Sequence, residues 1–391
     1  MANDRAIYFD NAATTPLDPR VGEAMAPWLG DEYGNPSSLH APGRRARAGI
    51  DKAREQVAAL IGARPREIVF TGSGTESDNL ALAGVIAAQC DAPGHLVTSA
   101  IEHPAILETA RALQRRGVAL TIVPVDAVGR VDPDDVWRAL RPETRLVSIM
   151  AANNVIGTLQ PVEEIARITR DAGVLFHTDA VQAAGAVRFD VTASAIDLLS
   201  LSAHKLHGPK GVGALYVRQG VTLAPLIYGG GQERGLRSAT ENVAGIVGLG
   251  RAAELAAERL SREIAGLSAL RDRLIAGILD ACPNAYLIGD PLRRLAGHVC
   301  VGFSGQEGEA IRLLLALDEA GVAVSTGSAC SASHTAEPSY VLQALGFDAF
   351  RARGALRLTL GRQNTAEEVE RVLAVLPGLV RSLRRIATSR R

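Results

Sequence analysis

Lysine is scarce in this sequence, although basic residues are not. Lysine and arginine together number 42 in 391 residues, and only three of them are lysines, at Lys52, Lys205 and Lys210. A neutral lysine amine can condense with a carbonyl to form a Schiff base, whereas an arginine guanidinium stays protonated. If the protein uses a covalent amine, one of these three residues must supply it.

Cysteine is nearly as sparse. The four cysteines, Cys90, Cys282, Cys300 and Cys330, are far apart in the chain and include no C-x-x-C pair. This spacing indicates neither a disulfide framework nor a zinc site. The first three lie in apolar surroundings, so we expect them to be inert.

Long apolar runs and an excess of charge are also missing. No run approaches the roughly 20 residues that span a bilayer. The 42 acidic residues balance the 42 basic ones, which argues against a nucleic-acid or membrane surface. The segment Met1–Arg5 is not the apolar core of a secretory signal, so we expect a cytoplasmic protein.

What the sequence does contain is a regular alternation of apolar strands and helices from about residue 67 to 217. This alternation predicts an α/β fold, with a mostly parallel sheet covered by helices on both faces. Open sheets of this kind bind ligands beyond the carboxyl ends of their strands. A single polar residue there usually satisfies a turn, but five strand ends each deliver a different functional group: Thr75, His103, Asn154, Asp179 and Lys205.

The first of these strand ends leads into a turn rich in glycine and serine at residues 71–79, and we expect a helix at 80–88. Backbone N–H groups at the start of a helix can bind a phosphate. A plain capped turn explains this segment nearly as well, and it matches neither of the standard nucleotide-binding loops.

The last strand end carries Lys205, where the apolar run 196–201 stops at Ser202 and His204. A lysine held at the end of a buried strand loses its charge more easily than one in water, because a low dielectric disfavours the ammonium. Such a lysine can act as a covalent amine. From this stretch alone, Lys205 is equally well interpreted as a solvent-exposed lysine in a loop.

A second group of elements follows a glycine-rich loop at 229–240. We expect a long helical region at 241–280, strands at 299–303, 322–325 and 355–360, and helices at 308–320, 340–345 and the C-terminal end. Thr365 and Glu368 are spaced as a capping box for the last helix. These patterns predict an N-terminal segment and two domains, at 1–15, 16–258 and 259–391.

Cys330 differs from the other cysteines, because it lies among small polar residues at 326–335. An exposed thiol can ionise and attack an electrophile, whereas a buried thiol cannot. His334 is four residues further on and could polarise it. Cys330 is therefore a candidate nucleophile, with an incidental surface cysteine as the alternative.

Taken together, these motifs resemble the cysteine desulfurases of the NifS/IscS type, in the class V aminotransferase family. The matching stretches occur in order along nearly the whole chain: YFDNAATT, GNPSSLH, FTGSGTESDN, EHPA, NNVIG, HTDAVQ, SAHKLHGPKG, RSATEN, STGSACSA and EPSYVL. The resemblance implies fold type I, with a large α/β domain containing a mostly parallel, seven-stranded sheet and a smaller α+β C-terminal domain. It also implies pyridoxal 5'-phosphate as the cofactor.

The resemblance assigns a role to each candidate residue. Lys205 would bind the cofactor covalently, His103 would stack on its ring and transfer protons, and Cys330 would accept sulfur. Asp179 would pair with the ring nitrogen and Gln182 with the phenolic oxygen. The remaining implied residues are Gly74, Thr75, Ser202 and His204 for the phosphate, Thr240 for the phosphate of a partner subunit, and Asn35, Asn154 and Arg357 for the substrate, with Asn154 also near the cofactor.

The implied reaction converts L-cysteine to L-alanine and leaves a persulfide on Cys330. The implied partners are a second copy of the chain and a sulfur acceptor or iron–sulfur scaffold protein. No metal is needed for catalysis, although the Cys330 persulfide could contact a nascent iron–sulfur cluster. A selenocysteine lyase, another aminotransferase or lyase of the same fold, and a non-catalytic scaffold stay open as alternatives.

Overall fold

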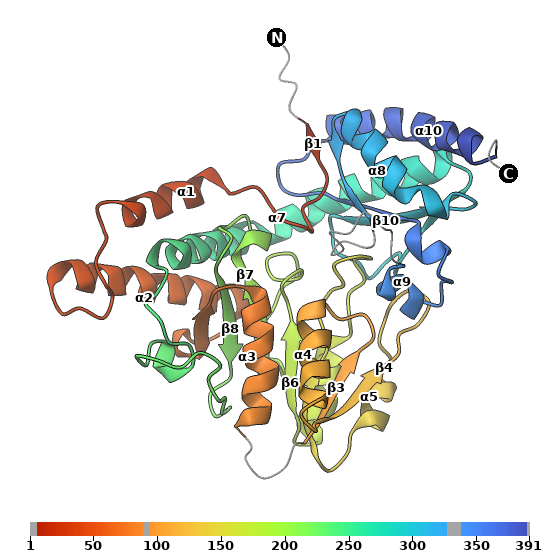
Figure 1. Ribbon diagram of the computed structural model, residues 1–391. Helices are drawn as coiled ribbons and strands as arrows, with labels where there is room; N and C mark the ends of the chain where they lie inside the picture. The colour runs from red at the N-terminus through yellow and green to blue at the C-terminus, as the bar shows by residue number, and fades with distance from the viewer. Residues whose placement is uncertain (1–5, 89–93, 327–337, 389–391) are drawn as a thin grey trace.

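The computed structural model describes residues 6–88, 94–326 and 338–388 of the chain (Figure 1). A seven-stranded sheet forms its centre, in the order β2-β8-β7-β6-β5-β3-β4. Only β8 runs antiparallel to its neighbours, which confirms the predicted mostly parallel sheet. The strands are β2 (Ile68–Thr71), β3 (His95–Ser99), β4 (Ala119–Val123), β5 (Thr144–Ser148), β6 (Leu175–Asp179), β7 (Leu198–Ser202) and β8 (Gly213–Val217).

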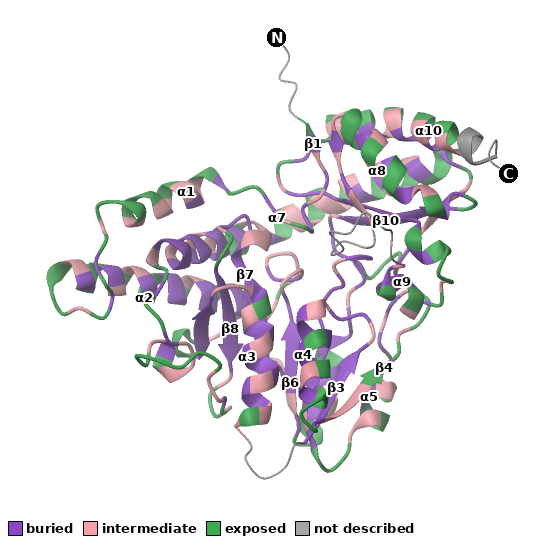
Figure 2. Ribbon diagram, in the orientation of Figure 1, coloured by how far each residue is buried: buried purple, intermediate pink, exposed green. Residues whose placement is uncertain are grey.

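Both faces of this sheet are buried. Successive residues of a strand point to opposite faces, so a continuous apolar strand contributes to a hydrophobic core on each side. In β3, Leu96 packs with one hydrophobic core and Val97 with the other. Figure 1 shows α3 and α4 in front of the sheet, and the buried residues in Figure 2 follow the sheet through the centre. The helices that precede these strands or lie between them are α1 (Pro19–Met25), α2 (Ala41–Ile61), α3 (Gly74–Ala87), α4 (Pro104–Gln114), α5 (Pro133–Ala139) and α6 (Val162–Asp171).

The prediction for the first glycine-rich turn was wrong in one respect. Helix α3 begins at Gly74 and not near residue 80, with Ser73 as its N-cap. The Ser73 Oγ accepts a hydrogen bond from the Glu76 backbone N–H at 3.1 Å. Gly74 and Thr75 are therefore the first two residues of a helix, where backbone N–H groups have no partner within the helix.

A long helix, α7 (Val243–Ala281), joins this unit to a second one and confirms the predicted helical region. The second unit has a four-stranded antiparallel sheet in the order β12-β13-β10-β9, packed against the later part of α7 and against α8 and α10. The elements are β9 (Ala285–Leu287), β10 (His298–Phe303), α8 (Ala310–Glu319), β12 (Ser325–Thr326), α9 (Tyr340–Ala344), β13 (Ala355–Thr359) and α10 (Ala366–Thr388).

The predicted capping box of the last helix is present. The Thr365 N–H donates to Glu368 Oε2 at 3.1 Å, and the Glu368 N–H donates to Thr365 Oγ1 at 3.3 Å. The predicted domain boundary after residue 258 falls inside the unbroken helix α7, and its position stays a prediction.

The N-terminal segment crosses to the second unit. Strand β1 (Ile7–Tyr8) pairs in parallel with β11 (Val322–Ala323). The single strand predicted at 322–325 is thus two short strands, of which β12 pairs with β13 instead. Short 3₁₀ helices complete the fold: η1 (Ala26–Leu29), η2 (Pro65–Glu67), η3 (Ala203–Lys205), η4 (Glu233–Gly235), η5 (Glu307–Glu309) and η6 (Arg351–Arg353).

Candidate active site

A cavity of about 470 Å³ opens at the carboxyl ends of the central strands. It collects most of the residues that the sequence singles out, although they come from separate loops and helix starts. The predicted residues that line it are Gly74, Thr75, His103, Asn154, Asp179, Gln182, Ser202, His204, Lys205 and Arg357.

Two predicted residues lie elsewhere in the described part of the chain, and a third lies outside it. Asn35 is exposed in the loop before α2, where its Oδ1 accepts a hydrogen bond from the Ser37 N–H at 2.9 Å. Thr240 is exposed in the loop before α7. Cys330, together with His334, lies outside the described residues.

Lys205 is the last residue of η3, the turn that follows β7. Its Nζ donates a hydrogen bond to the Ala13 carbonyl at 2.8 Å and another to the Ala12 carbonyl. Gln182 Nε2 donates to the same Ala12 carbonyl at 2.9 Å. The N-terminal segment thus holds the lysine amine at the edge of the cavity.

Asp179 and His103 are close enough for each to affect the protonation of the other. Burial raises the pKa of Asp179, while the Val181 N–H at 2.8 Å from its Oδ1 and the charges of His103 and Lys205 oppose that shift. Burial lowers the pKa of His103, aided by Lys205 and opposed by Asp179. Nδ1 of His103 accepts the Ala105 N–H at 3.1 Å, which assigns the imidazole proton to Nε2.

The start of α3 forms one wall of the cavity. A Cβ added to Gly74 would lie 2.7 Å from Val181 Cγ2 and 3.3 Å from Ser202 Cβ, so the wall has no room for a side chain there. His204 Nδ1 lies 3.2 Å from Thr14 Oγ1. Burial lowers the pKa of His204 to about 4, so near neutral pH its imidazole is uncharged.

Arg357 reaches the cavity from β13 of the second unit and is 1% exposed. Its Nη2 lies 2.8 Å from Asp10 Oδ1, and its Nη1 donates to the Asn154 carbonyl at 2.9 Å. Arg357 Nε and Asn154 Oδ1 are both buried without a hydrogen-bond partner in the described part of the chain. Unpaired buried polar atoms are rare in folded proteins and are typical of sites that bind a ligand.

Sequence reasoning missed three ionisable residues of the site. Asp10 pairs with Arg357, and its place just after a short extended segment was the available signal. Lys210 lines the cavity from the Gly-Pro-Lys-Gly turn, and its charge contributes to the low pKa of His204. Asp78 lines the cavity from the second turn of α3, in a segment that we expected to be a loop.

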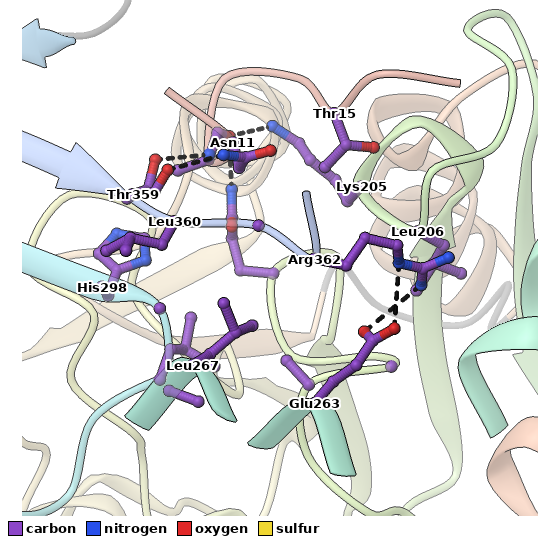
Figure 3. A pocket seen from close by; sticks show the side chains of 18 of the residues that line it. Asn11, Thr15, Lys205, Leu206, Glu263, Leu267, His298, Thr359, Leu360 and Arg362 are labelled. Atoms are coloured by element: carbon purple, nitrogen blue, oxygen red, sulfur yellow. Dashed lines mark hydrogen bonds and ion pairs between the residues drawn. The ribbon is translucent and has the colours of Figure 1, made fainter. Parts of the chain in front are cut away.

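A second cavity lies on the other side of Lys205 and Gln182, which line both spaces. Figure 3 shows the Lys205 amine directed toward the N-terminal segment near Asn11, with the ion pair of Arg362 and Glu263 elsewhere on the wall. Arg362 Nε lies 3.1 Å from Glu263 Oε1. This ion pair joins α7 to the segment after β13 next to the lysine.

Two cysteines fall in the described part of the chain, and both are buried. Burial raises the pKa of Cys300 to about 12 and also raises the pKa of Cys282. Neither thiol forms a thiolate near neutral pH, as expected from the apolar sequence around them.

The described residues contain neither a candidate metal site nor a membrane-spanning helix. No group of three or more His, Cys, Asp or Glu side chains in ranges 6–88, 94–326 and 338–388 could hold a metal ion. In the same ranges, no helix has the length and apolar character needed to cross a bilayer. The cytoplasmic location stays a prediction.

The comparison with known families identifies the class of this protein. The chain belongs to the class-V aminotransferase family, whose profile matches residues 7–372. Within that family it is similar to "Cysteine desulfurase IscS" of Methanosarcina thermophila, at 49% identity over 98% of this chain and 94% of that protein. It is also similar to "Cysteine desulfurase" of Gluconacetobacter diazotrophicus, at 49% identity over 98% of this chain and 95% of that protein. The resemblance inferred from the motifs is confirmed.

Solved structures agree with this placement. A structure titled "NIFS-LIKE PROTEIN" superposes with a TM-score of 0.90 at 41% identity, over 96% of this chain and 100% of that one. A structure titled "SspA in complex with cysteine" gives a TM-score of 0.80 at 37% identity, over 90% of this chain and 98% of that one. The predicted fold, type I of the pyridoxal-phosphate enzymes, is therefore confirmed.

Proposed function

We propose that this protein is a pyridoxal-phosphate-dependent cysteine desulfurase, which converts L-cysteine to L-alanine and takes the sulfur onto Cys330 as a persulfide. The observation that carries the proposal is one cavity in which Lys205, Asp179 and His103 meet. Relatives at 49% identity with the printed name cysteine desulfurase support the substrate and the reaction.

The residues of the cavity fit the cofactor. Gly74 leaves open the start of α3, where free backbone N–H groups suit a phosphate. Ser202 and His204 line the same cavity and would complete the phosphate site. The buried Asn154 Oδ1 and Arg357 Nε lack partners in the described residues, which leaves them available to a bound molecule.

When bound, pyridoxal phosphate supplies an electron sink that stabilises negative charge at the α-carbon of an amino acid. Lys205 is the amine that would hold the cofactor, because Lys52 is exposed on α2 and Lys210 is exposed in a turn. Asp179 would bind the protonated ring nitrogen, and Gln182 would donate a hydrogen bond to the phenolic oxygen. His103, neutral with its proton on Nε2, is suited to stack on the ring and to transfer a proton.

Arg357 would bind the carboxylate of the substrate. Two of its nitrogens already bind Asp10 and the Asn154 carbonyl, which fixes the plane of the guanidinium. A fixed guanidinium can bind two carboxylate oxygens at once. Asn154 and Asn35 complete the proposed substrate set.

Cys330 would provide the thiolate that accepts sulfur. Burial keeps Cys282 and Cys300 protonated, and Cys90 lies outside the described residues. From Cys330 the sulfur would pass to an iron–sulfur scaffold protein or to another thiolation acceptor. The name IscS on the similar relatives supports a partner of this kind.

We infer that the enzyme is a homodimer. Large apolar side chains are exposed in the loop between α1 and α2 and in the loop after β8, as expected of a surface that a second copy covers. Thr240, in the same part of the molecule, would reach the phosphate of the partner subunit. The exposed side chains, with their exposed fractions, are Leu29 (74%), Tyr33 (83%), Leu39 (89%) and Tyr228 (79%).

Incubation of the purified protein with L-cysteine and a dithiol reductant tests this function. We expect alanine and sulfide in equal amounts. The variant C330S should bind the cofactor normally and still change its absorbance when cysteine is added, but release almost no sulfide, because a serine hydroxyl does not ionise near neutral pH. Desulfuration by C330S at the wild-type rate would remove Cys330 from the mechanism, and alanine without sulfide would contradict the proposed reaction.

A further inference from the structure

Asp78 is a buried carboxyl group of the cavity to which the proposed reaction gives no role. It lies on α3 four residues after Gly74, so the two residues share one face of the helix. Its side chain lines the same cavity as Asp179 and is 1% exposed. Its Oδ1 has no hydrogen-bond partner in the described residues.

A histidine within ion-pair distance of Asp78 carries no charge. His177 Nε2 lies 3.7 Å from Asp78 Oδ1, but His177 is completely buried and burial lowers its pKa to about 3. The ring nitrogens of His177 lie 2.8 Å from Ser148 Oγ and 3.0 Å from Ser200 Oγ. A neutral imidazole between two hydroxyl groups cannot balance a carboxylate charge.

The surroundings of Asp78 disfavour its ionisation. Asp179 at the end of β6 and Glu102 after β3 are acids, and with burial as the largest cause they raise the pKa of Asp78, while a hydrogen bond from Ser200 opposes the shift. Among the cations of the cavity, Arg357 pairs with Asp10, and Lys205 is held by backbone carbonyls. Two neighbouring buried carboxyl groups do not both ionise, so one of the pair retains its proton.

We propose that Asp78 is a positioning residue that stays protonated and leaves Asp179 as the only charged carboxyl of the pair. The geometry assigns these roles, because Asp179 accepts the Val181 N–H and is favoured by the charge of Lys205, whereas Asp78 has the Ser200 hydroxyl as a donor and its Oδ1 has no partner in the described residues. A second charge beside Asp179 would pull the proton of a bound ring nitrogen toward the pair. A neutral Asp78 keeps that proton on the ring, so the inference deepens the proposed function and rests on it.

Infrared difference spectroscopy of the purified holoprotein tests the protonation state directly. Subtracting the spectrum of D78N from that of the wild type near neutral pH should show the carbonyl band of one protonated carboxylic acid. D318N, at an exposed aspartate on α8, is the matched control and should show a carboxylate band instead. A carboxylate band in the difference spectrum of wild type and D78N would overturn the proposal.

The pH titration of the cofactor absorbance tests the action through Asp179. D78N keeps a neutral side chain of the same shape, so we expect its titration midpoint to match that of the wild type. D78A also carries no charge beside Asp179, so its midpoint should stay close to that of the wild type as well. A similar shift of the midpoint in D78N and D78A would show that the wild-type Asp78 is charged and would contradict the proposal.

The outcomes separate this inference from the proposed function. If the protein failed to desulfurate cysteine, the infrared result for Asp78 would be unaffected and only the reaction would be wrong. If the enzyme released sulfide but the difference spectrum of wild type and D78N showed a carboxylate band, the proposed reaction would be supported and the role of Asp78 would be wrong.

Discussion

Burial sets the protonation of the titratable side chains around the cavity. It lowers the pKa of His177 and His298 to about 3, and it raises the pKa of Glu102 to about 8. Near neutral pH the buried histidines are therefore neutral bases, and Glu102 is mostly a neutral acid. The charge in this part of the molecule is concentrated on a few groups, chiefly Lys205, Asp179 and the pair of Arg357 with Asp10.

At Lys205 we predict loss of the covalent cofactor link. The variant K205A should lack the visible absorbance of lysine-bound pyridoxal phosphate, because the amine that forms the bond is gone. K210A is the matched control, since Lys210 lines the same cavity from an exposed turn, and it should stay yellow. A yellow K205A protein with the cofactor linked to another residue would contradict the assignment.

Glu102 should make stability fall as pH rises. Its Oε1 accepts hydrogen bonds from Ser99 Oγ at 2.5 Å and from the Met150 N–H at 3.0 Å, but burial still raises its pKa to about 8. Between about pH 4.5 and pH 8 the folded state holds a proton that the unfolded state has lost, so the free energy of unfolding decreases across that window.

The variant E102Q removes this titration. Its stability relative to the wild type should increase from about pH 5 to about pH 9, by a few kcal/mol at the upper end. Urea unfolding at several pH values measures the difference, with E319Q at an exposed position of α8 as the control. A difference between E102Q and wild type that does not change with pH would show that Glu102 is ionised in the folded protein.

Strand ends explain how much of the site the sequence predicts. His103, Asp179 and Lys205 each follow a recognisable apolar strand, so their meeting in one cavity could be expected. Asp78 could not, because its role depends on which face of α3 it occupies and on the neutral state of His177 beside it. Asp10 could not either, since its partner Arg357 is far away in the sequence.

Among the elements, α3 carries a special requirement at its first residue. Gly74 has no room for a Cβ because Val181 and Ser202 stand against it. The variant G74A should force this wall apart at a cost of about 1–3 kcal/mol, which lowers the affinity for pyridoxal phosphate roughly ten- to hundredfold. Equilibrium dialysis or absorbance titration of the apoprotein with the cofactor measures the loss.

Gly266 provides the matched control for this helix glycine. It lies in α7, and a Cβ added there meets no atom within 4 Å. The variant G266A should keep cofactor affinity and gain about 0.5–1 kcal/mol of stability from the lower flexibility of alanine. If G74A bound the cofactor as tightly as G266A, the close approach at Gly74 would not matter for binding.

The sequence predicted neither the true start of α3 nor the division of residues 322–326 into two short strands. Gly, Ser and Thr dominate residues 71–77 and have low helix propensity, which hid the first turns of α3. Two-residue strands such as β1 and β11 give almost no periodic signal, and their pairing is a tertiary contact. The long helix α7, in contrast, was evident from the helical spacing of its apolar residues.

For the whole molecule, the proposed dimer can be tested by mixing inactive protomers. T240A protein lacks the residue proposed to reach the partner's phosphate, and K205A protein lacks the covalent amine. In a hybrid dimer, the site with an intact Lys205 receives Thr240 from its partner, so activity should return to a part of the wild-type level. The measurement is sulfide release after the two variants have been unfolded and refolded together.

Separate refolding of each variant is the control for this experiment, and it should give little activity. A protein that sediments as a fully active monomer would rule out the shared site. If co-refolding restored no activity although hybrid dimers formed, Thr240 would act within its own subunit or not at all.

The N-terminal segment has a consequence for how the protein is made. Residues 7–14 leave the ribosome well before residues 322–359, yet β1 pairs with Val322–Ala323, Asp10 with Arg357, and Asn11 donates to the Thr359 carbonyl at 2.8 Å. The carbonyls that hold the Lys205 amine belong to this same segment. Residues 7–14 must therefore wait for residues 322–359 to be synthesised, and a nascent chain cannot complete these contacts before then.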